Sequence, residues 1–152
     1  MDRFLMRVHM GYPDVVAETE ILRAEAGAAQ LDTVESVLTG ADVLAMQKVV
    51  TQVEVDDALI KYALEIVRRT RNHEKLTLGV SPRGSQMLYR AAQAMAFLDG
   101  RAFCVPEDFK PLVVPVFAHR VAIPGMHSSG MKKGVRAEDV IQEIVDTVPV
   151  PV

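Results

Sequence analysis

The chain has 152 residues, of which 49% are hydrophobic and 5% aromatic, and its formal net charge is −3. These values predict a packed globular chain of modest size and exclude a wholly disordered one. They also provide no overall attraction to nucleic acid or to an anionic membrane, so we expect neither as a partner.

The first regular pattern is at residues 3–10, where apolar side chains alternate along the sequence RFLMRVHM. Phe4, Met6, Val8 and Met10 share one parity, which predicts a β-strand. A Gly-Tyr-Pro sequence then ends the pattern, and no second strand follows nearby. Because a lone strand leaves its backbone groups unpaired, we expect this strand to belong to a sheet formed by residues outside this chain.

The rest of the chain has the periodicity of α-helices separated by short links. A weakly patterned connector covers residues 27–42, and a loop rich in glycine and serine covers residues 122–134. The predicted helices run from Asp14 to about residue 26, from Asp42 to about residue 50, from the N-cap Asp56 to about residue 75, from Pro82 to about Asp99, from Pro106 onward, and from Ala137 to Thr147.

Two details of these helices are specific predictions. Gly100 is placed to end the helix that starts at Pro82, because glycine readily adopts the left-handed conformation that follows a helix. Pro111 and Pro115 are expected to kink or interrupt the helix that starts at Pro106. The sum is an all-α fold, a helical bundle preceded by one residual strand.

The start of one helix, Ser81-Pro82-Arg83-Gly84, combines good and poor helix-forming residues. Ser81 suits the N-cap and Pro82 suits the first helical position. Arg83 opposes the helix dipole, and Gly84 weakens a helix by about 0.5–1 kcal/mol relative to alanine. Both make sense if an anion binds, since Arg83 is a forked cation and the helix N-terminus offers N–H groups. The alternative is that Arg83 pairs with a surface carboxylate.

Other candidate sites are weaker. Arg3, in the sequence Asp-Arg-Phe, could reach a neighbouring subunit or could be an ordinary solvated side chain. The single cysteine, Cys104, is expected to be a buried thiol, which is consistent with a cytoplasmic location. The four histidines are scattered, so no metal site is expected. No Walker A phosphate-binding loop is present.

Several segments together resemble the C-terminal part of MoxR-type AAA+ ATPases. They are DRF and GYP near the start, LGVSPRGS, QMLYRAAQAMAFLDGR, GRAFCVPEDFKPLVVPVFAHR and the final VPVP. The resemblance covers nearly the whole chain, and residues 78–120 are its most specific part. It implies a helical lid domain over residues 14–152, preceded at residues 1–13 by the last strand of the missing α/β core.

The resemblance also implies roles for individual residues. Arg83 is similar to the sensor 2 arginine, which reaches from the lid to the γ-phosphate of ATP. Ser81, Pro82 and Gly84 would then flank the nucleotide. Arg3 is similar to the arginine finger, which completes the ATP site of the neighbouring subunit.

For the whole protein, the resemblance implies a chaperone-like remodelling ATPase that hydrolyses ATP with Mg²⁺ and assembles into a ring, usually a hexamer. Its implied partners are its own AAA+ core, the neighbouring subunits and a von Willebrand factor A protein. The Walker A and Walker B segments would lie outside this chain. We therefore expect this chain alone to bind no cofactor and to have no ATPase activity.

Two other functions are compatible with the residues. One is a helical protein-interaction module with no nucleotide role, in which charge reversal at Arg83 would leave partner binding intact. The other is nucleic-acid binding through the basic residues that end the helix from Asp56, including Arg68, Arg69 and Lys75. The acidic net charge argues against this last function, and those basic residues more simply complement the helix dipole.

Overall fold

The computed structural model describes residues 3–23, 34–124 and 135–151. Its regular elements in this part of the chain are six α-helices and one 3₁₀ helix, so the all-α prediction is confirmed. The helices are α1 (Val15–Arg23), α3 (Gly40–Val50), α4 (Asp57–Arg71), α5 (Pro82–Leu98), α6 (Pro106–Phe117), η1 (Ala118–Arg120) and α7 (Ala137–Thr147).

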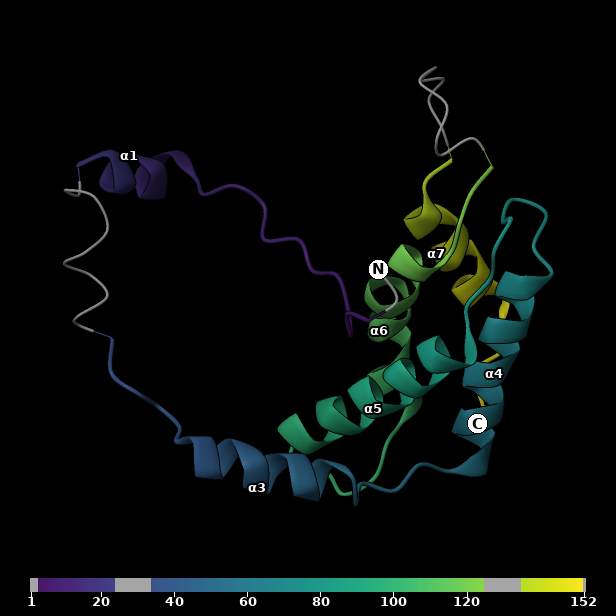
Figure 1. Cartoon of the computed structure of the whole chain (residues 1–152), viewed down its shortest axis with the longest axis horizontal. Helices are drawn as coiled ribbons and strands as arrows, with labels where there is room; N and C mark the ends of the chain where they lie inside the picture. The colour runs from purple at the N-terminus through teal and green to yellow at the C-terminus, as the bar shows by residue number, and fades with distance from the viewer. Residues whose placement is uncertain (1–2, 24–33, 125–134, 152) are drawn as a thin grey trace. The chain divides into compact units, whose positions relative to one another are not determined.

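The hydrophobic core lies among α4, α5, α6 and α7, which pack against one another (Figure 1). Each of these helices contributes apolar side chains to it. The fully buried ones include Ile66, Leu88, Phe109, Phe117 and Ile141, each with 0% exposure. Large aliphatic and aromatic side chains spaced by three or four residues give each helix one apolar face, and packing these faces together stabilises the bundle.

The predicted helix boundaries agree closely with the structure where local capping decides them. Asp56 is the N-cap of α4 and accepts a hydrogen bond from the N–H of Ala58 at 2.7 Å. Ser81 is the N-cap of α5. Gly100, after the end of α5, has a φ of 74°, as expected for a glycine that follows a helix.

Pro111 and Pro115 do not interrupt their helix, because α6 runs without a break from Pro106 to Phe117, and the alternative that they kink it stays a prediction. The two prolines are four residues apart and therefore lie on one side of the helix. Pro111 is exposed, and the carbonyl of Pro115 accepts a hydrogen bond from the N–H of Arg7 at 2.9 Å. The opposite side of α6 is buried in the core, and this packing offsets the lost helical hydrogen bonds.

The strand predicted for residues 3–10 does not form among the described residues, where this segment is a turn, a bend and irregular chain. No strand forms anywhere in the described residues, so the alternating segment has no neighbour with which to build a ladder. Instead, its first residues lie against α6 and η1 (Figure 1). The pattern in the sequence was strand-like, but a strand requires a partner.

The chain divides into two compact units. One comprises residues 1–7 and 47–152, and the other comprises residues 8–46. In the second unit α1 has no buried residue, and its apolar side chains Val15, Val16, Ile21 and Leu22 are 63–82% exposed. The predicted domain boundary after residue 13 stays a prediction, since compactness alone does not define a domain.

Across the described residues, no helix combines the length and the apolar composition that crossing a bilayer requires. The predicted loop at residues 122–134 lies outside the described residues from residue 125 onward.

Candidate functional site at the start of α5

The first turn of α5 presents Arg83 to solvent. The Ser81 hydroxyl accepts a hydrogen bond from the N–H of Gly84 at 3.3 Å, and Pro82 occupies the first turn. Arg83 is exposed, and within the described part of the chain its side chain forms no hydrogen bond or ion pair. The surface carboxylate considered as its partner is therefore absent from the described residues. A forked cation at a helix N-terminus is available to bind an anion.

Contacts with the end of α4 fix the position of this turn. The N–H of Val80 donates to the Thr70 hydroxyl at 3.0 Å, and Arg71 Nε donates to the carbonyl of Val80 at 2.9 Å. Thr70 is itself buried and donates to the carbonyl of Val67 at 2.7 Å. Gly79 packs so closely against Arg71 that an added Cβ would lie 2.6 Å from its Cα. The residue before Ser81 is therefore held rigidly.

Gly84 has a packing role that the sequence did not suggest. It is buried, and an added Cβ would lie 2.5 Å from Val80 Cγ1 and 3.1 Å from Arg120 Cδ. Such a separation from Val80 is too short for a real contact, so a side chain here would require movement. This packing by itself explains the glycine. The prediction that Gly84 also lets an anion approach stays a prediction.

The variant Gly84→Ala is expected to destabilise the protein by about 1–2 kcal/mol. Overpacking a well-filled site costs roughly 1–3 kcal/mol, and alanine returns about 0.5–1 kcal/mol of helix propensity. Urea unfolding measures the change. Gly40→Ala is the matched control, because nothing lies within 4 Å of a Cβ at the first residue of α3. A Gly84→Ala protein as stable as the parent would contradict the packing role.

Arg3, the other predicted arginine, lies in a segment that is bound to η1. Arg3 is exposed. The carbonyls of the two following residues, Phe4 and Leu5, accept hydrogen bonds from the guanidinium of Arg120. His119 Nε2 lies 3.2 Å from the carbonyl oxygen of Phe4. Further along, Arg7 forms an ion pair with Glu138 on α7.

The surroundings of His119 disfavour its protonated form. Burial lowers its pKa below the ordinary value of about 6.5, and the charges of Arg120 and Arg7 lower it further. A neutral imidazole offers one acceptor nitrogen, and Arg120 Nη1 lies 2.7 Å from its Nε2. The lowered pKa thus disfavours a second positive charge beside the buried Arg120.

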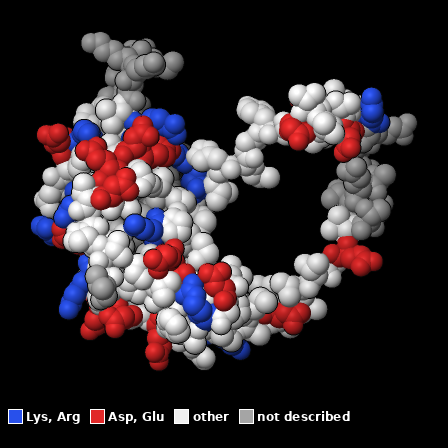
Figure 2. All heavy atoms as spheres, turned by 180° about the vertical axis from the view of Figure 1, so that it is seen from behind, with Lys and Arg blue, Asp and Glu red and all other residues white. Residues whose placement is uncertain are grey.

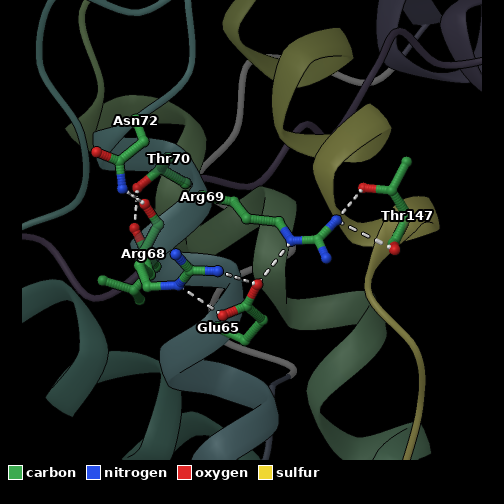
Figure 3. A network of polar contacts seen from close by, with 7 residues as sticks. Glu65, Arg68, Arg69, Thr70, Asn72 and Thr147 are labelled. Carbon is green, nitrogen blue, oxygen red and sulfur yellow. Dashed lines mark hydrogen bonds and ion pairs between the residues drawn. The ribbon is translucent and has the colours of Figure 1, made fainter.

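The basic residues at the end of α4 form a network of polar contacts that does not include Arg83 (Figure 3). Glu65 accepts hydrogen bonds from Arg68 and Arg69, which hold its pKa at about 2. Arg69 also donates to the carbonyl and the hydroxyl of Thr147, the last residue of α7, at 3.2 and 2.9 Å. Arg69 therefore complements the C-terminal end of α7, a contact that the sequence could not indicate.

This network leaves little unpaired positive charge at the end of α4. Lys75 pairs with Glu143 at 2.7 Å, in addition to the two arginine pairs with Glu65. On the face shown in Figure 2, basic and acidic side chains are interspersed over the helical unit. The local charges thus offer no concentrated basic surface at the helix end that was considered for nucleic-acid binding.

Among the described residues, no group of three or more His, Cys, Asp or Glu side chains is arranged to hold a metal ion. Sequence reasoning missed Arg120, Thr70 and Arg71, which hold the predicted site residues in place. Their positioning roles could not be read from local spacing, because each acts through contacts with residues 9 or more positions away.

Comparisons with known proteins point to one family for this chain. The family model described as the AAA lid domain matches residues 68–144. YeaC of Bacillus subtilis is 38% identical over 152 residues, covering 100% of this chain and 47% of that protein. Chaperone MoxR1 of Mycobacterium tuberculosis is 29% identical over 159 residues, covering 99% of this chain and 41% of that protein.

A crystal structure from Cytophaga hutchinsonii, whose protein is provisionally assigned as an ATPase, superposes with a TM-score of 0.81 and 26% identity. The match covers 99% of this chain and 48% of the other. The chain therefore spans less than half the length of each of these three proteins.

Proposed function

This chain belongs to the AAA lid domain family and is related to MoxR proteins along its whole length, and from this premise we propose that it acts as the nucleotide-sensing lid of a ring-forming, chaperone-like MoxR-type ATPase. In this function the lid closes over ATP that is held by an AAA+ core. Lid closure would exclude water from the phosphates and would pass the nucleotide state to the neighbouring subunits.

The observation that carries the proposal is the state of Arg83. An exposed arginine lies in the first turn of a rigidly anchored helix and has no partner among the described residues. Arg83 would act as the sensor 2 arginine and donate to the γ-phosphate of ATP. A guanidinium suits this role because it is always charged and presents donors in a planar fork that matches phosphate oxygens.

The residues present fit a phosphate but not the whole nucleotide site. The first turn of α5 offers Arg83 and the exposed end of a helix, whereas Mg²⁺ requires several oxygen ligands that the described residues do not gather. ATP and Mg²⁺ would therefore be held by the core, where the metal neutralises phosphate charge. Arg3 would act in trans as an arginine finger on the neighbouring subunit's ATP.

The exposed apolar side chains of residues 8–46 favour a lid that packs against a larger protein surface. Several of their large apolar side chains are exposed, including Met10 at 97%, Tyr12 at 100% and Leu22 at 82%. Exposed apolar patches of this kind mark interaction surfaces. The proposed AAA+ core, held in the cytoplasm with the rest of the ring, would cover them.

The direct test is the preference of the protein for ATP over ADP. In a protein that joins this chain to its nucleotide-binding core, Arg83→Ala is expected to weaken ATP binding by about 10-fold or more, because one charge-assisted contact is worth roughly 1.5–3 kcal/mol. ADP affinity is expected to be unchanged, since ADP has no γ-phosphate. Fluorescent nucleotide titration measures both affinities.

Arg90→Ala is the matched control for this titration. Arg90 is exposed on the same helix, but its side chain binds Gln93 and lies two turns from the N-terminus. It should leave both affinities unchanged. Equal weakening of ATP and ADP by Arg83→Ala would contradict a γ-phosphate contact and would leave the interaction-module function as the better account.

A further inference from the structure

Arg120 is buried at the point where two otherwise separate parts of the chain meet. It ends η1, and only 7% of its surface is exposed. Its guanidinium donates to the carbonyls of Phe4 and Leu5, which follow Arg3, and to the carbonyl of Val116 in α6. More than 110 residues of sequence separate Arg120 from the first two of these acceptors. One side chain thus fixes the backbone next to Arg3.

The stem of the same side chain lies beside the first turn of α5. A Cβ at Gly84 would lie 3.1 Å from Arg120 Cδ and 3.8 Å from Nε. Gly84 directly follows Arg83. On the N-terminal side of Arg83, the backbone of Val80 is held by hydrogen bonds with Thr70 and Arg71. Arg120 therefore binds the carbonyl of Phe4, beside Arg3, and lies next to Gly84, beside Arg83.

We propose that Arg120 is a positioning residue that holds Arg3 and Arg83 in a fixed relation to each other. The inference rests on the proposed function for the roles of those two arginines, but the positioning itself is a property of this chain. An arginine suits the task because its planar fork can bind several carbonyls at once while its long stem packs against a glycine. Lysine keeps the charge but lacks the fork.

The consequence is a link between adjacent ATP sites. Arg83 acts on the nucleotide of its own subunit, whereas Arg3 acts on that of its neighbour. A movement of α5 that follows the γ-phosphate would press on Arg120 through Gly84 and would shift the segment that carries Arg3. The space between Gly84 and the Arg120 stem is smaller than a Cβ ordinarily needs, so a movement of this turn toward Arg120 would meet its side chain.

The first test measures the position of residue 3 relative to α5 in this chain. Spin labels are attached to cysteines placed at Arg3 and Gln86, both exposed, in a background where Cys104 is replaced by alanine. Electron-spin dipolar spectroscopy then reports the distance distribution. We expect one narrow population in the parent and in Arg90→Ala, and a distribution broadened at least two-fold in Arg120→Ala and Arg120→Lys.

Circular dichroism confirms that each variant keeps its helices, and Arg120→Lys serves if Arg120→Ala does not fold. A broad distribution in the parent would overturn the proposal. So would a distribution that stays narrow in whichever Arg120 variants are folded.

The second test distinguishes positioning from general stabilisation. In the protein joined to its core, Arg120→Lys is expected to lower the ATP-over-ADP preference, and the double variant with Arg83→Ala should be no worse than Arg83→Ala alone. A purely structural role would weaken both nucleotides equally and would contradict the proposal. If Arg83→Ala itself leaves the preference unchanged, the proposed function fails, while the spin-label distances still decide the role of Arg120.

Discussion

Replacing Arg83 with alanine is expected to lower ATP turnover by about 100-fold in a protein that joins this chain to its nucleotide-binding core. Removal of one preorganised donor from a developing oxyanion typically costs roughly 100- to 1,000-fold in rate. Arg83 is placed to make such a contact, because it is exposed at the start of a helix whose preceding residue is tied to α4. Steady-state turnover at saturating ATP measures the effect.

Two variants sharpen this experiment. Arg83→Lys keeps the charge but loses the forked geometry, so its turnover should lie between those of the parent and the alanine variant. Arg90→Ala removes an exposed arginine from the same helix and should have no effect. Turnover that is unchanged in a folded Arg83→Ala protein would reduce Ser81-Pro82-Arg83-Gly84 to an ordinary helix start. Partner binding would then become the function to examine.

The largest loss of stability is expected from Asp108→Ala, at about 3 kcal/mol in urea unfolding. Asp108 is 1% exposed and lies in the first turn of α6. It accepts hydrogen bonds from Arg101 Nη1 and Nη2 at 2.7 and 2.5 Å, and from the N–H of Val105 at 2.8 Å. Val105 is the N-cap residue and has no side-chain acceptor, whereas Asp108 at the third helical position accepts from the Val105 N–H, as the acidic residue of a capping box does.

Asp99→Ala provides the matched control for Asp108→Ala. Asp99 also pairs with Arg101, at 2.9 Å, but its side chain is 61% exposed. Exposed ion pairs contribute about 0–1 kcal/mol, so the control should change stability little. Similar losses in the two variants would contradict the assignment of Asp108 as the buried anchor.

The Asp108 contribution also has a defined pH dependence. Burial acts to raise the pKa of Asp108, but hydrogen bonds from Arg101 and Val105 outweigh it and lower the pKa overall. A lowered folded-state pKa means that this stabilisation is present above the unfolded value of about 3.9 and is lost as the pH falls through the folded value. Below about pH 4, the stability difference between the parent and Asp108→Ala should therefore shrink.

The sequence by itself determined most of the helices and the place of Arg83 in the first turn of one of them. Asp56 and Ser81 mark helix starts because their side chains bond to N–H groups two or three residues away. Gly100 marks a helix end for an equally local reason. Such contacts lie within a few residues, so spacing in the sequence records them. The first turn of α5, with Arg83 in it, could be found in this way.

Only the tertiary structure decided how that turn is held and what replaces the predicted strand. Gly84 packs against Arg120, and Arg120 binds the carbonyls of Phe4 and Leu5. Arg69 likewise donates a hydrogen bond to Thr147, 78 positions away. Its place near the end of α4 had suggested only that it complements the dipole of its own helix. These contacts depend on which helix faces pack together, and local spacing carries no record of that. The alternating pattern at residues 3–10 likewise forms no strand among the described residues, because a ladder needs a partner that local sequence cannot supply.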